Sequence, residues 1–251
     1  MKDHPLLFSG PMVRAILDGR KTQTRRVMKP QPDPRETEFR FNADNGCWFG
    51  VCPRNPETGG PTRGRDFRSP YGVPGDRLWA KEAWAVRAAS TGGSLSDCPG
   101  RRLGFCYRAS GEQADEDGHV QIHQEVQVDR ETQQKYRRLI TEPNWRSARF
   151  MPKIACRLWL EVLRVWPERV QDISEADALA EGIRRFEYGT QYGTAHISIG
   201  YGTSRLALGA MAPTAANAFC RLWDSINAAS GHPWANNDWV WAIEFKRINH
   251  A

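Results

Sequence analysis

A lysine and two threonines lie close together near the start of this chain of 251 residues. The run Gly19-Arg20-Lys21-Thr22-Gln23-Thr24-Arg25-Arg26 places Lys21 three residues before Thr24. A lysine acts as a general base on a threonine hydroxyl once burial lowers its pKa. A nearby carboxylate must then orient the ammonium or shuttle the proton. The residues alone leave a second interpretation open, a basic junction that is merely solvated.

The elements that would position this cluster are a short helix and the strand after it. Ser9 is a typical N-cap, and apolar residues at Val13, Ile16 and Leu17 share one helical face. Gly19 supplies the C-terminal stop. The β-branched stretch 22–27 then favours a strand. A twist at this junction would turn Lys21 toward Thr24.

The rest of the chain predicts five or six strands and three short helices, without the alternation of a parallel sheet. We expect an α+β fold, a small and mostly antiparallel barrel with peripheral short helices and long loop insertions. Residues 1–251 then form a single domain, with insertions at 30–70, 88–146 and 186–213. The predicted strands are 6–8, 22–27, 77–86, 105–107, 157–165 and 239–246, the later helices are 175–180 and 214–228, and 120–140 is ambiguous between strand and helix.

Composition limits the class of protein. Thirty-five Lys and Arg against 29 Asp and Glu give a net charge of +6, which permits an anionic partner such as nucleic acid. The chain has no apolar run long enough for a membrane span, and its first ten residues lack one of signal-peptide length. We therefore expect a cytoplasmic protein with no membrane partner. Six scattered cysteines without zinc-site spacing predict free thiols and no metal.

Several segments resemble one known family in their order along the chain. The stretch from Ile16 to Arg26 is similar to the opening signature of the ASCH (activating signal cointegrator homology) family, whose fold is a PUA-like β-barrel. Gly75-Asp76-Arg77-Leu78-Trp79 resembles its next turn and strand, the stretch from Ile173 to Ile183 its short acidic helix, and Val240 to Phe245 its closing strand. The wider pattern is similar to phage and prophage members, which implies the cytoplasm of a bacterial host.

The resemblance implies a reaction and three residues that carry it. The small bacterial relatives are N4-acetylcytidine amidohydrolases with a lysine–threonine–glutamate triad, which falls on Lys21, Thr24 and Glu181 of this sequence. Thr24 would be the nucleophile on the N4-acyl carbonyl, and Lys21 its base and later its acid. Glu181 would position Lys21 or the hydrolytic water. This scheme requires no metal or organic cofactor.

The same resemblance suggests substrate contacts. Arg25 and Arg26 stand where those enzymes have an apolar residue and one arginine, which would suit a phosphorylated substrate. Trp79 ends the second motif, and Lys81 and Glu82 come just after it; an aromatic ring and a carboxylate there would suit a pyrimidine. The alternative is that Trp79 is core and Glu82 pairs with an arginine.

Two functions follow for this chain. The first is an amidohydrolase acting on a cytidine-type nucleoside or nucleic acid, with no obligatory protein partner. The second is a non-catalytic module of phage origin that binds RNA or modified DNA, with Lys21, Arg25 and Arg26 on phosphates. A phage assembly factor ranks last.

Overall fold

A computed structural model describes residues 1–53, 59–88, 102–110, 124–141, 145–189, 197–206 and 208–249. Within these residues it has four α-helices, α1 (Gly10–Leu17), α2 (Arg130–Thr141), α3 (Glu175–Ala180) and α4 (Ala215–Asn227). The strands are β1 (Asp3–Leu7), β2 (Gln23–Val27), β3 (Glu38–Asn42), β4 (Cys47–Cys52), β5 (Thr62–Phe67), β6 (Arg77–Lys81), β7 (Trp84–Ala88), β8 (Arg102–Tyr107), β9 (Gln124–Gln127), β10 (Trp159–Arg169), β11 (Arg184–Gly189), β12 (Ile197–Gly202) and β13 (Trp239–Ile248). This is an α+β fold, as the sequence predicts.

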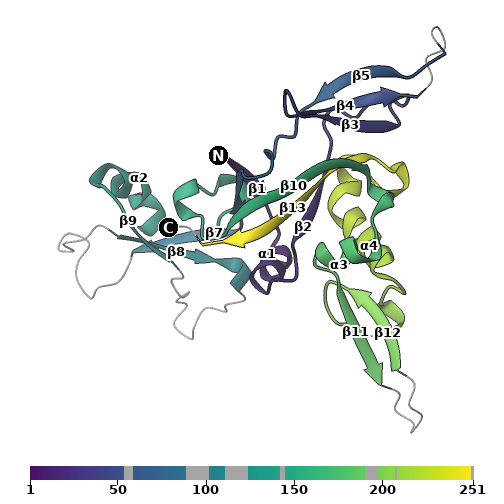
Figure 1. The fold of residues 1–251 in the computed structure, drawn as a ribbon. Helices are drawn as coiled ribbons and strands as arrows, with labels where there is room; N and C mark the ends of the chain where they lie inside the picture. The colour runs from purple at the N-terminus through teal and green to yellow at the C-terminus, as the bar shows by residue number, and fades with distance from the viewer. Residues whose placement is uncertain are drawn as a thin grey trace. The chain divides into compact units, whose positions relative to one another are not determined.

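The strands form four sheets, mostly antiparallel, and the described residues form no closed barrel. The largest sheet has the order β1-β6-β10-β13-β2, and the smaller ones are β3-β4-β5, β7-β8-β9 and the hairpin β11-β12 (Figure 1). The expectation of five or six strands is wrong, because all three regions predicted to be loop insertions contain strands. The first of these regions, 30–70, is rich in Pro, Gly, Arg and Asp, a composition typical of loops, and this composition masks its short strands.

The chain divides into two compact units. Unit 1 comprises Met1–His4, Asp18–Arg77 and Glu161–Lys246, and unit 2 comprises Pro5–Leu17, Leu78–Leu160 and Arg247–Ala251. The expected single domain, with its three insertions, stays a prediction.

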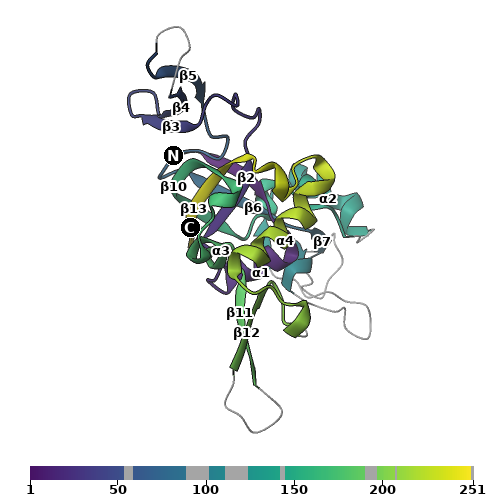
Figure 2. The ribbon, with the colours of Figure 1, turned by 90° about the vertical axis from the view of Figure 1, so that its right-hand side faces the viewer.

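In unit 1 the helices α3 and α4 pack together over an apolar core that includes Ala178, Phe219 and Trp223 (Figure 2). The side-chain oxygen of Ser174 accepts from the backbone N–H of Asp177, which caps the start of α3 where the sequence predicts a helix over 175–180. The Glu175 carboxylate accepts from the first two backbone N–H groups of α4, at 2.7 and 3.1 Å. These caps fix the start of α3 against the start of α4, and Glu181 follows directly after the last residue of α3.

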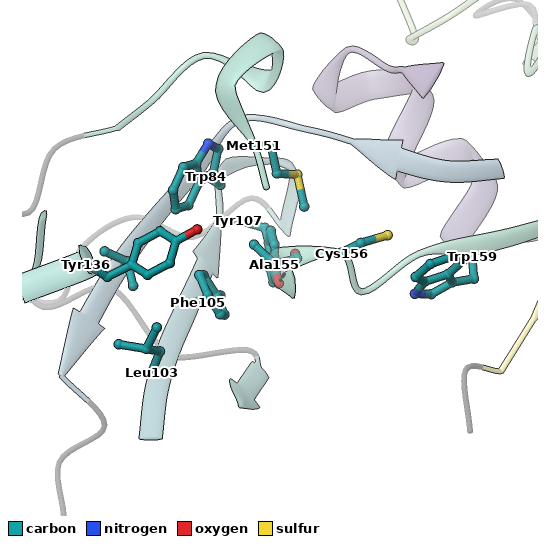
Figure 3. Packing of buried hydrophobic residues seen from close by; sticks show 10 residues of the cluster. Trp84, Leu103, Phe105, Tyr107, Tyr136, Met151, Ala155, Cys156 and Trp159 are labelled. Atoms are coloured by element: carbon teal, nitrogen blue, oxygen red, sulfur yellow. Dashed lines mark hydrogen bonds between the residues drawn. The ribbon is translucent and has the colours of Figure 1, made fainter. Parts of the chain in front are cut away.

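In unit 2 the rings of Trp84, Phe105, Tyr107 and Tyr136 gather over β7 and β8 (Figure 3). The expected strand 77–86 is two strands, β6 and β7, which belong to different sheets. Between them Glu82 is wholly buried, and its carboxylate pairs with an arginine. Within the stretch 120–140, which the sequence left ambiguous between strand and helix, the described residues include β9 and most of α2. Cys98, His119 and His123 lie outside the described residues.

In the β3-β4-β5 sheet of unit 1 a buried carboxylate explains why two positions are occupied by glycine. Glu36 is 3% exposed, and its carboxylate accepts from the backbone N–H groups of Asp33 and Arg65 at 2.9 and 2.8 Å. A Cβ atom at Gly50 or Gly64 would overlap the Glu36 side chain. Only glycine therefore leaves room for the carboxylate at these two positions.

We predict that Gly64→Ala lowers the free energy of unfolding by about 1–3 kcal/mol, the usual cost of overpacking a filled site. Urea denaturation followed by circular dichroism measures the change. Gly60→Ala is the matched control, because an added Cβ there meets nothing within 4 Å. Equal stability of the two variants would contradict this explanation of Gly64.

Candidate active site

Lys21 is a buried lysine whose ammonium is fully hydrogen-bonded. Its side chain is 0% exposed and forms an ion pair with Glu181, which is 3% exposed, at 2.5 Å. The Nζ atom also donates to the carbonyl oxygens of Glu181 and Gln23, at 3.0 and 2.7 Å. An ammonium has three donors, so these acceptors use all of them.

The local backbone explains how a residue 160 positions away reaches Lys21. Glu181 is the C-cap of α3, and its own N–H bonds to the carbonyl of Asp177. Gly182 follows with φ of 99°, the left-handed conformation that favours glycine and ends a helix. On the other side, the N–H of Thr22 donates to the carbonyl of Ala180 at 2.8 Å. The two segments are thereby held against each other.

Burial lowers the pKa of Lys21, and this is the largest influence on it. The charge and hydrogen bond of Glu181 raise the pKa, whereas the charges of Arg26 and Arg25 lower it. The net shift is downward from the ordinary lysine value. A lysine of lowered pKa releases its proton at a lower pH than usual, which a general base requires.

Arg25 joins three carboxylates around this pair. Its Nε donates to Glu168 at 2.6 Å, its Nη1 to Glu181 at 3.4 Å, and its Nη2 lies 3.6 Å from Asp177. The guanidinium is 0% exposed. The positive charge of Arg25 therefore balances the negative charges of these three carboxylates in unit 1.

Asp177 links the helix cap to the strand that carries Thr24. Its carboxylate accepts from the side-chain amide of Gln23 at 2.9 Å and from the Ser174 hydroxyl at 2.7 Å. Burial raises the pKa of Asp177, but these hydrogen bonds and the charge of Arg25 stabilise the carboxylate and hold its pKa below the usual value. The sequence analysis missed Asp177 and Glu168. A helical spacing of four from Glu181 would have indicated Asp177, but Glu168 carried no local signal.

Thr24 lies on β2 opposite Ile243 of β13 and is 1% exposed. The residue before it, Gln23, supplies a carbonyl oxygen to the Lys21 ammonium. Within the described residues Lys21 makes no hydrogen bond to the Thr24 hydroxyl. The structure thus brings Lys21 and Glu181 into direct contact. Thr24 lies on β2 directly after Gln23, whose carbonyl binds the Lys21 ammonium. Arg26, opposite Trp241, is half-buried.

Three other predicted residues belong to unit 2. Glu82 is wholly buried, and Arg157 donates to both of its carboxylate oxygens at 2.9 and 3.0 Å. The sequence analysis kept this arginine pairing as an alternative. The Nζ of Lys81 lies 5.2 Å from the centre of the Trp79 ring and donates to the carbonyl of Arg149. Trp79 is half-buried beside the core of unit 2.

The described residues contain no group of three His, Cys, Asp or Glu side chains that could hold a metal ion. The described cysteines, Cys47, Cys52, Cys106, Cys156 and Cys220, are free thiols. No described helix has the length and apolar character needed to span a membrane. No family model, curated protein or solved structure matches the chain.

We predict that Arg25→Met lowers the free energy of unfolding by about 3–5 kcal/mol, because it leaves buried carboxylates without their cation. Urea denaturation at neutral pH measures the loss. The control is Arg35→Met, which removes an exposed arginine from its pair with Asp33 and should change stability little. Similar losses in both variants would show that the buried network does not depend on Arg25.

Proposed function

We propose that this chain is an ASCH-type amidohydrolase that removes an N4-acyl group from a cytidine-type nucleoside or nucleic acid. The observation that carries the proposal is the buried contact between Lys21 and Glu181, beside the strand that bears Thr24. Burial lowers the pKa of a lysine, and a neighbouring carboxylate raises it. Together they set the pH at which the lysine can act as a base. The PUA-like barrel, the single-domain organisation and the phage origin belong to the same proposal.

In the first step Lys21 acts as the base and Thr24 as the nucleophile. Neutral Lys21 keeps two N–H donors and gains a lone pair, so one of its three hydrogen bonds is released. The lone pair accepts the Thr24 proton while the hydroxyl oxygen forms a bond to the acyl carbonyl carbon. Glu181 holds the resulting ammonium in place.

In the second step the C–N bond breaks. Lys21 returns the proton to N4 of the leaving cytosine, and the acyl group stays as an ester on Thr24. Water then attacks the ester with Lys21 as base again, which releases a carboxylic acid and regenerates the threonine. The steps consume one water and need no redox partner.

Charge pairing favours the enzyme over the alternative binding module. Lys21 and Arg25 direct their donors to groups of unit 1, so a phosphate would have to displace buried carboxylates to bind them. We therefore assign Arg25 a positioning role. In unit 1 Arg26 is half-buried with a wholly buried Nε, and in unit 2 the Glu82 carboxylate already binds Arg157.

We predict that purified protein converts N4-acetylcytidine to cytidine, or an acetylated oligonucleotide to its deacetylated form, with the product measured by chromatography. Thr24→Ala and Lys21→Met should each lower the rate at least a hundredfold, since they remove the nucleophile and its base. Thr22→Ala is the matched control, because this threonine is exposed and lies two residues away. Absence of turnover in the wild type, with the correct fold verified, would refute the proposal.

We predict opposite shifts of the pH profile for two neighbours of Lys21. The active base is neutral Lys21, so activity rises as pH passes its pKa. Glu181 raises that pKa, and Glu181→Gln should therefore move the midpoint to lower pH. Arg25 lowers it, and Arg25→Gln should move the midpoint to higher pH.

Rates measured from pH 6 to 10 give both midpoints, and Arg25→Lys should keep the wild-type midpoint because it retains the charge. A merely structural role for either residue would lower the rate at every pH without moving the midpoint. Shifts in the same direction for both variants would contradict Lys21 as the base.

A further inference from the structure

Unit 2 contains a cavity that the proposed reaction does not use. Its volume is about 770 Å³, and it is lined by residues of β9, of the segment 153–159 and of the chain end at 247–249. Sites for small molecules commonly have about 300–1,000 Å³, so the space suffices for a ligand of nucleotide size.

The wall of this cavity carries basic groups and no acidic one among its described lining residues. Lys153, Arg157 and Arg247 supply the cations. Burial raises the pKa of Cys156, which also lines the cavity, to about 12, so its thiol is neutral at physiological pH. The lining therefore attracts anions.

The three cations differ in what already holds them: the Nζ of Lys153 lies 5.4 Å from the centre of the Trp159 ring, which also lines the cavity. Arg157 is fixed, because it donates to both oxygens of Glu82 and its guanidinium lies 4.1 Å from the centre of the Tyr107 ring. Glu82 balances its charge. Arg247 is exposed, and its side chain makes no hydrogen bond or ion pair within the part of the chain that the structure describes. Its planar donors suit a phosphate.

Apolar side chains form another part of the wall. Val126, Ile154 and Ile248 are half-buried and line the cavity, and the Gln124 and Asn249 amides lie beside them. A half-buried apolar surface next to amides suits a flat base, whose faces are apolar and whose edges form hydrogen bonds. Cations and apolar wall together fit a base joined to a phosphate.

We propose that the cavity lined by Lys153, Arg157 and Arg247 binds a nucleotide, with its phosphate at Lys153 and Arg247 and its base on the apolar wall. The ligand is either a free nucleotide or one unit of a single strand, since both present the same chemistry. This site shares no residue with the proposed active site and does not rest on the proposed reaction.

Isothermal titration calorimetry of the full chain with AMP, adenosine and a short oligoadenylate RNA tests the proposal. AMP carries no N4-acyl group and no cytosine, so it is not a substrate of the proposed enzyme. We expect AMP or the RNA to bind, adenosine to bind at least tenfold more weakly than AMP, and affinity to fall with added salt. Binding of AMP itself identifies a free-nucleotide site, and binding of the RNA alone identifies a strand site.

Variants locate the binding in this cavity. Lys153→Ala and Arg247→Ala should each weaken binding roughly tenfold, the usual effect of losing one charge-assisted hydrogen bond. Lys246→Ala is the control, because alternation along β13 places this exposed lysine on the face opposite Arg247, where it pairs with Glu161. Its affinity should stay within about twofold of the wild type.

The proposal would be overturned if neither AMP nor the RNA bound. It would also be overturned if Lys153→Ala and Arg247→Ala folded correctly and bound with the affinity of the wild type. Titration of Thr24→Ala separates the two proposals. If this variant binds as the wild type does, the nucleotide site stands whether or not the chain hydrolyses N4-acetylcytidine.

Discussion

The buried ion pair between Lys21 and Glu181 constrains the structure around it. Taking two charges out of water is costly, and their attraction offsets that cost only where the remaining donors and acceptors are also satisfied. The carbonyls of Gln23 and Glu181 satisfy the ammonium, and Arg25 balances the second oxygen of Glu181. The start of β2 and the end of α3 must therefore lie together for this unit to fold.

The same arrangement sets the chemistry of Lys21. Burial disfavours its charged form, and the neighbouring arginines do so as well, whereas Glu181 favours it. Because burial is the largest of these influences, the lysine keeps its position through the carboxylate and still loses its proton more readily than a lysine in water. A fully hydrogen-bonded ammonium and a lowered pKa are thus consistent. Together they describe protonated Lys21 before it acts as a base.

The sequence predicted the helices α3 and α4 from residues that lie within or next to them. The predicted helices 175–180 and 214–228 correspond to α3 and α4, whose starts are capped by Ser174 and Thr214. The strands β3 to β5 were missed because the stretch that contains them is rich in Pro, Gly, Arg and Asp, a composition typical of loops, although Phe39 and Phe41 alternate with polar residues. The pairing of Glu82 with Arg157, which lies 75 positions away, leaves no local trace in the sequence.

The candidate site was predictable only in part, because its groups come from segments that lie far apart in the sequence. A lysine near a threonine suggested base chemistry, but the pairing of Lys21 with Glu181 followed from a resemblance and not from spacing. The carboxylates around Arg25 come from β10 and α3, so no window of sequence contains them together.

The central claim is that burial makes Lys21 a base, and its pKa can be measured directly. NMR titration of protein with isotope-labelled lysine follows the Lys21 Nζ, assigned by the loss of its signal in Lys21→Arg. We expect this group to titrate below the ordinary lysine value of about 10.4, and lower still in Glu181→Gln. A Lys21 that titrates at or above the ordinary value would contradict the account.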